Sequence, residues 1–220
     1  MNEDDMAWLT RLVTDAEEAA NWLTHGLGLL LSLIGLFALV WPAITRGDLA
    51  HITSAWVFGG SLVFMYAAST LYHAFRDPRV KSILRIADHV AIYFLIAGSY
   101  TPFLLVHFEG RYQTTLLAAI WTLALVGTLF KLFFTGRFLR LSTSFYLLMG
   151  WLAMTALEPF LRALPAACVL WLLAGGLLYT GGVAFFLWEQ LPFSHAIWHL
   201  FVMGGSTCHY TAVLLYVIPA

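Results

Sequence analysis

Charged residues are scarce in this chain. Only 10% of its 220 residues are Asp, Glu, Lys or Arg, whereas about a quarter is usual for a soluble domain. Hydrophobic residues make up 61%, and the mean hydropathy is +0.82. This composition excludes an ordinary soluble domain and predicts a membrane protein. The net charge of −1 gives no basic surface for nucleic acid, so we expect no nucleic-acid partner.

Cysteine is also scarce, which excludes a disulfide framework. Cys168 and Cys208 lie in apolar stretches of two different predicted helices, so both are interpreted as small buried hydrophobic residues. The first five residues, Met1–Asp5, are acidic and lack the positive charge that begins a secretory signal. We therefore expect no cleaved targeting peptide.

Long apolar runs dominate the rest of the chain. A helix that crosses a membrane needs roughly 20 mostly apolar residues, and seven runs meet this requirement. Pro, Gly or charged residues separate them, and every connection is short. Residues 21–220 are therefore predicted to form one all-α membrane domain, a bundle of seven transmembrane helices without a β-sheet. The seven predicted spans are Trp22–Trp41, Ser54–Phe75, Ala87–Phe108, Thr115–Phe134, Thr143–Leu161, Ala166–Trp188 and His195–Ile218.

Residues 1–20 are predicted to form a juxtamembrane cytoplasmic segment. Thr14-Asp-Ala-Glu17 resembles a capping box, which indicates that a helix begins nearby. Two alternatives remain open for this segment. It is either a short helix that lies along the membrane interface or a solvated, disordered tail.

The distribution of Lys and Arg predicts the orientation, because cytoplasmic loops carry an excess of these residues. A cytoplasmic N-terminus places eight basic residues in the cytoplasm: Arg11, Arg76, Arg79, Lys81, Arg85, Lys131, Arg137 and Arg140. The opposite side then holds three: Arg46, Arg111 and Arg162. We therefore predict a multi-pass protein of the cell membrane with a cytoplasmic N-terminus and an extracytoplasmic C-terminus.

Several ionisable residues interrupt the apolar spans. Such residues are costly inside a membrane and usually mark a functional site. In the predicted topology His73, Asp88, His195 and His199 all lie at the cytoplasmic ends of their helices, as does His25. Polar residues on apolar helices must point into the bundle, because lipid cannot satisfy their hydrogen bonds.

The histidines of the second and seventh spans could supply three nitrogen ligands. His195 and His199 are one helical turn apart, and His73 ends the second span on the same face as Ser69. Three protein ligands with a fourth position open for water are typical of a catalytic zinc site. The spacing of the pair alone is a weak signal. A lone intramembrane histidine is commonly only an interhelical hydrogen-bond partner, and we favour that interpretation for His25, His89 and His209.

Four stretches of the chain, in order, resemble the hemolysin III family. They are Asn21–Gly26, Ser69–His73, Asp88–Phe103 and His195–Val202. This family belongs to the adiponectin- and progestin-receptor-like superfamily of seven-helix membrane proteins. The resemblance implies a zinc ion held by His73, His195 and His199, with Asp88 and Ser69 beside its bound water. It also implies a ceramidase-like activity, because receptors of the superfamily are associated with one.

The favoured functional hypothesis is a zinc-dependent intramembrane hydrolase that acts on a lipid amide or ester. Zinc would activate water and polarise the substrate carbonyl. Asp88 would orient that water or take its proton, and Ser69 would support it. Membrane lipids are the expected partners, because acyl chains reach a site within the leaflet more easily than soluble metabolites do.

Two further hypotheses differ in class. The first is a non-catalytic receptor or regulator of membrane lipid state, in which zinc ties the second and seventh helices together. The second is a pore-forming haemolysin. A pore needs a polar path across the whole bilayer, whereas the ionisable residues here gather at one depth and the fourth to sixth spans carry almost none. This distribution argues against direct pore formation.

Overall fold

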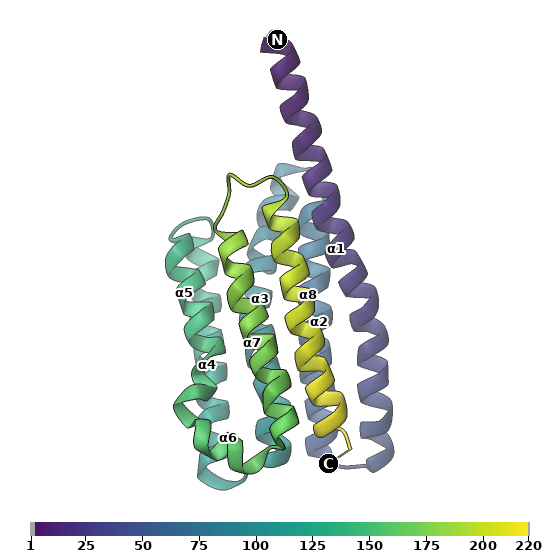
Figure 1. The fold of residues 1–220 in the computed structure, drawn as a ribbon, viewed down its shortest axis with the longest axis vertical. Helices are drawn as coiled ribbons and strands as arrows, with labels where there is room; N and C mark the ends of the chain where they lie inside the picture. The colour runs from purple at the N-terminus through teal and green to yellow at the C-terminus, as the bar shows by residue number, and fades with distance from the viewer. Residues whose placement is uncertain (1–2, 220) are drawn as a thin grey trace.

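The computed structural model describes residues 3–219, except the side chains of residues 3–12, Arg46 and Ala156. The side chains of Arg11 and Arg46, used above to predict the orientation, thus lie outside the described part. All regular structure in the described residues is helical, which confirms an all-α fold (Figure 1). The elements are α1 (Glu3–Arg46), α2 (Leu49–Ala74), α3 (Pro78–His107), α4 (Gly110–Phe134), α5 (Leu139–Gly150), the 3₁₀ helix η1 (Leu152–Ala156), α6 (Leu157–Ala163), α7 (Ala166–Phe186) and α8 (Ser194–Tyr216).

Five of these helices are long and apolar enough to cross a membrane, which supports a membrane helical bundle. They are α1 from Val13 to Thr45, α2, α3, α4 and α7. The 23 residues of α8 also suffice in length. This helix, however, carries His195, His199 and His209 among its apolar residues.

The predicted span Thr143–Leu161 is not one continuous helix. α5 ends at Gly150, and its 12 residues cover about 18 Å, which is less than the hydrocarbon core of a bilayer. η1 and α6 follow, and α6 lies across the end of the bundle remote from the start of α1 (Figure 1). Pro159 lies in the first turn of α6, where a missing N–H is tolerated. A helix continuing through it would instead clash with the carbonyl of Thr155.

Tyr100 of α3 satisfies the backbone groups that this break exposes. Its hydroxyl donates to the carbonyl of Gly150 at 2.7 Å and accepts from the backbone N–H of Ala153 at 2.9 Å. Broken helices occur at membrane depth only where protein groups replace the lost hydrogen bonds. The side chain of one neighbouring helix therefore makes the interruption possible.

Capping residues define the short connections. Asp48 accepts a hydrogen bond from the backbone N–H of Ala50 at the start of α2, and this bond lowers the pKa of the Asp48 carboxyl. Asp77 accepts from the backbone N–H groups of Arg79 and Val80, and Pro78 occupies the first turn of α3. An aspartate cap followed by proline is a strong helix start.

Sequence neighbours pack side by side along the bundle. α1 contacts α2 and α8, α2 contacts α3, α3 contacts α4, and α7 contacts α8. Glycine allows close contacts between these helices: Gly98 of α3 lies against Ser61 of α2, and Gly127 of α4 lies against the ring of Tyr93, where a Cβ would overlap. Small residues at helix interfaces are typical of membrane bundles.

α1 does not end or turn at the predicted segment boundary. Residues 3–20 continue it as one helix, whose first turns extend beyond the other helices (Figure 1). Acidic side chains of this segment contact other parts of the bundle near this end. Asp15 forms an ion pair with Arg76, and Glu17 accepts a hydrogen bond from the backbone N–H of Phe193. The segment thus joins the bundle where α2 ends and α8 begins.

Candidate metal centre

Three histidines from two helices meet inside the bundle. His73 comes from the last turn of α2, and His195 and His199 come from the first two turns of α8. The ring centroid of His73 lies 5.0 Å from that of His195 and 5.2 Å from that of His199. One nitrogen from each ring can be chosen so that all three lie within 4.8 Å of one another. The residues expected to bind a metal ion are therefore brought together.

The surroundings of these rings fit a metal ion. His73 and His199 are buried, and Nε2 of His73 is shielded from solvent without a hydrogen-bond partner. An unpartnered buried nitrogen is unfavourable, and metal coordination would satisfy it. Three imidazoles with no fourth protein ligand among the described residues match the donor set of an open zinc site.

α1 holds two of the three rings. Nδ1 of His73 donates to Oε2 of Glu18 at 2.6 Å, and the other carboxylate oxygen of Glu18 accepts from Nζ of Lys81, also at 2.6 Å. Nδ1 of His199 lies 3.2 Å from the backbone carbonyl of Asn21 and 3.1 Å from Oγ1 of Thr24. Both rings therefore present Nδ1 to α1, which leaves Nε2 available to a metal ion.

His25 completes this face of α1. Its ring stacks on that of His199, with centroids 3.4 Å apart and an interplanar angle of 14°. Both of its nitrogens are buried and have no hydrogen-bond partner. In the described structure the contacts of His25 are therefore mainly ring contacts, and its role as an interhelical hydrogen-bond partner stays a prediction.

The other two histidines assigned to hydrogen bonding differ from each other. Nε2 of His209 lies 3.3 Å from the backbone carbonyl of Leu172, so it links α8 to α7 as expected. His89 contributes its backbone carbonyl, which accepts from the hydroxyl of Tyr146, while its Nδ1 is buried without a partner. His89 therefore does not use its side chain as predicted.

Asp88 and Ser69 lie beside the histidine cluster. Both line the same cavity as His195 and His199, and the Asp88 carboxylate is close enough to interact with the Ser69 hydroxyl and with His73. Arg85 and Lys131 also act on Asp88 electrostatically. Among the ion pairs of the described residues, none joins Asp88 to Arg85. The Asp88 carboxylate therefore does not form an ion pair with Arg85 in the described structure.

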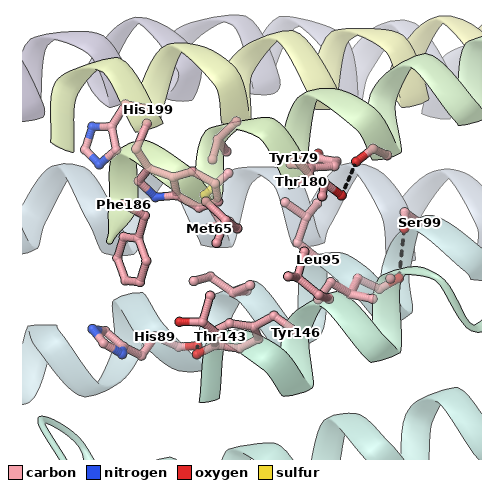
Figure 2. A pocket seen from close by; sticks show the side chains of 18 of the residues that line it. Met65, His89, Leu95, Ser99, Thr143, Tyr146, Tyr179, Thr180, Phe186 and His199 are labelled. Atoms are coloured by element: carbon pink, nitrogen blue, oxygen red, sulfur yellow. Dashed lines mark hydrogen bonds between the residues drawn. The ribbon is translucent and has the colours of Figure 1, made fainter. Parts of the chain in front are cut away.

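An apolar cavity extends from the cluster along the inside of the bundle (Figure 2). Figure 2 shows His199 and His89 on opposite walls near one end, with Tyr179, Thr180 and Ser99 toward the other. The cavity also reaches His209, which is ten residues, or about 15 Å, further along α8 than His199. Its walls come mainly from α3, α5, α7 and α8. The shape suits a long apolar ligand with a reactive group near the histidines.

Sequence reasoning missed Glu18, Thr24 and Lys131. Glu18 precedes Asn21 by three residues and His25 by seven, so helical periodicity could have placed it on the same face. Glu18 was not considered as a site residue because it precedes the first predicted membrane span.

Lys131 is used above only as a basic residue that predicts the orientation. In the structure it is buried, 1% exposed, with Nζ 5.9 Å from the ring centre of Tyr146.

Comparison with known proteins gives consistent matches over nearly the whole chain. The family model described as Haemolysin-III related matches residues 14–210. Hemolysin-3 of Bacillus cereus is 47% identical over 216 residues, which cover 98% of each chain. The Hemolysin-3 homolog of Bacillus subtilis (strain 168) is 46% identical, covering 94% of this chain and 97% of the relative. The human monocyte to macrophage differentiation factor is 31% identical, covering 91% and 84%.

Proposed function

The chain belongs to the Haemolysin-III related family of multi-pass cell-membrane proteins, and we propose that it is a zinc-dependent hydrolase of a membrane-lipid amide or ester. His73, His195 and His199 are the proposed zinc ligands, and Asp88 and Ser69 are the proposed catalytic residues. The observation that carries the proposal is the meeting of three imidazoles at one end of an apolar cavity, which His195 and His199 line together with the carboxylate of Asp88.

The reaction adds water to the carbonyl carbon of the lipid and breaks its bond to nitrogen or oxygen. When bound, zinc supplies activation of water and polarisation of the carbonyl. The carboxylate of Asp88 takes a proton from the attacking water and returns it to the leaving amine or alcohol. In this proposal the hydroxyl of Ser69, which lines the cavity with Asp88, holds the carboxylate in the orientation that this transfer needs.

The lining of the cavity supports a lipid as the substrate. Ile92, Leu95, Leu147 and Val183 give it apolar walls along which an acyl chain can lie. His195 and His199 lie at one end, so the acyl chain would extend away from them toward the centre of the bundle. A small polar metabolite would leave most of this surface without a matching group.

The proposal is tested by metal analysis and by hydrolysis assays on the purified protein in lipid nanodiscs, with ceramides, other N-acyl lipids and ester lipids as substrates. The expected result is about one zinc per chain and hydrolysis of at least one of these classes. His199→Ala should abolish both. His107→Ala is the matched control, because His107 contacts the carbonyl of Tyr216 at the opposite end of α3. Hydrolysis that persists in His199→Ala would overturn the mechanism.

A non-catalytic receptor or regulator with structural zinc is the second candidate. It is favoured by the packing of the helices: α2 packs mainly on α1 and α3, whereas α8 packs mainly on α7 and α1. A metal bound between His73 and the α8 histidines would join two helices that both pack on α1 but make little direct contact with each other. Zinc that stabilises the fold without hydrolysis of any lipid class would favour this candidate.

The proposed topology has seven spans, with α5, η1 and α6 together forming the fifth. The start of α1 and the end of α8 lie at opposite ends of the bundle, which supports an odd number of crossings (Figure 1). The excess of Lys and Arg supports a cytoplasmic N-terminus. Single cysteines at Arg79 and Arg137, in a background without Cys168 and Cys208, should both react with an impermeant reagent from the cytoplasmic side. Labelling from opposite sides would contradict the topology.

A further inference from the structure

We propose that Glu18 is a positioning residue for the metal ligand His73, an assignment that rests on the metal centre of the proposed function. Glu18 lies on α1, His73 on α2 and Lys81 on α3, so one carboxylate joins three helices at the edge of the cluster. Its two oxygens have different partners. Oε2 binds the histidine, and Oε1 binds the lysine.

The contact with His73 determines which nitrogen is available. An ionised carboxylate can only accept hydrogen bonds, so the proton of the neutral ring lies on Nδ1, 2.6 Å from Oε2. The lone pair is then on Nε2, which is buried and has no partner. Metal-ligating histidines commonly donate their second N–H to such a carboxylate, which sets the ring orientation and makes the ligand more basic.

The contact with Lys81 keeps Glu18 in this supporting position. Nζ of Lys81 lies 2.6 Å from Oε1, and both side chains are about one-third exposed or less, at 27% and 34%. The ammonium group balances the carboxylate charge and fixes the second oxygen away from the histidine cluster. Glu18 therefore supports a ligand and does not act as a ligand itself.

The same face of α1 repeats this arrangement one turn further along the helix. The carbonyl of Asn21 accepts from Nδ1 of His199, which leaves Nε2 of that ring for the metal. α1 contributes no ligand of its own, yet it orients one ligand from α2 and one from α8. A simple fastening of α1 to α3 would need only the Glu18–Lys81 pair and would not require the short contact with His73.

The experiment measures zinc affinity of the full-length protein in nanodiscs by competition with a chromophoric chelator. Glu18→Gln should weaken zinc binding by about 10- to 100-fold, the usual effect of losing an outer partner of a metal ligand. Lys81→Met, which leaves Glu18 and His73 in place, should weaken it by a smaller factor. Asp15→Asn is the control, because it breaks another ion pair of α1, the exposed pair with Arg76, without touching a proposed ligand. It should bind zinc as the unmodified protein does.

A second readout separates positioning from general stabilisation. The visible absorption of bound cobalt(II) reports ligand geometry, so Glu18→Gln should change that spectrum and Asp15→Asn should not. Unchanged zinc affinity and an unchanged cobalt spectrum in Glu18→Gln would overturn the assignment. If that variant does not fold, unchanged affinity in Lys81→Met overturns it.

The measurement does not use hydrolysis, so the assignment and the enzymatic proposal fail separately. Zinc binding that depends on Glu18 without lipid hydrolysis would support the positioning role and reject the enzyme. If the unmodified protein bound no zinc, both would fail.

Discussion

The imidazole ring of His25 lies flat on that of His199, with 3.4 Å between the ring centroids. Tyr66 contacts His25 edge-on at 5.1 Å, so the stack is held from two sides. No hydrogen bond restrains the His25 nitrogens. The ring therefore acts on His199 through packing. Substitutions of His25 can test whether zinc binding needs an aromatic ring at this position or a nitrogen atom of His25.

Replacing His25 with Phe keeps an aromatic ring in the stack, whereas His25→Ala leaves a cavity beside His199. We expect His25→Phe to retain its zinc and His25→Ala to bind zinc more weakly, by less than about tenfold, because no hydrogen bond to a ligand is lost. Zinc content and chelator competition would measure both. Loss of zinc in His25→Phe would instead show that a nitrogen of His25 contributes to binding.

Removal of zinc should lower the thermal stability of the protein. A metal that binds only the folded state at 100 times its dissociation constant adds about 2.7 kcal/mol to stability. We expect the melting temperature in detergent to fall on treatment with a strong chelator and to return when zinc is added. His73→Ala should melt at the same temperature with and without chelator. An equal chelator effect in that variant would place the metal elsewhere.

The break between α5 and α6 depends on Tyr100. In Tyr100→Phe the backbone N–H of Ala153 and the carbonyl of Gly150 lose their partner. Leaving a polar group without a partner away from water costs about 1–3 kcal/mol. We expect Tyr100→Phe to be clearly less stable in thermal unfolding while keeping its zinc. Tyr210→Phe is a suitable control, because it removes one hydroxyl bond, to the carbonyl of Gly35 in continuous α1. Equal stability of the two variants would contradict the role assigned to Tyr100.

Hydropathy predicted the all-helical membrane bundle, and the predicted topology placed His73 and the α8 histidines at one depth. Their grouping as one set of ligands was implied by the resemblance to the hemolysin III family. Polar residues on apolar helices have only the interior of the bundle to face, so their convergence could be anticipated. The break in the fifth span could not be predicted, because apolar composition does not show that the hydroxyl of Tyr100 would form hydrogen bonds with the interrupted backbone. Glu18 lay outside the apolar run, and its role depends on the continuation of α1 past residue 20. The orphaned nitrogens of His25 depend on ring stacking, for which a sequence carries no signal.

Substitution of Asp88 tests whether the protein is an enzyme or a non-catalytic receptor with structural zinc. Its carboxylate lies with Ser69 on the cavity wall beside the histidines and forms no ion pair with Arg85 among the described residues. Asp88→Asn keeps the size of the side chain but cannot take a proton. We expect this variant to retain zinc and to hydrolyse lipid about 10²- to 10⁴-fold more slowly, the usual contribution of a positioned general base.

Arg85→Gln is the control for this variant, because it removes the neighbouring positive charge while leaving the carboxylate. If Asp88 acts on the reacting water, Arg85→Gln should retain most of the activity that Asp88→Asn loses. If Asp88 instead only balances the local positive charge, both variants should lose stability to a similar extent and keep their turnover. Comparison of zinc content, melting temperature and turnover in the two variants therefore separates a catalytic carboxylate from a structural one.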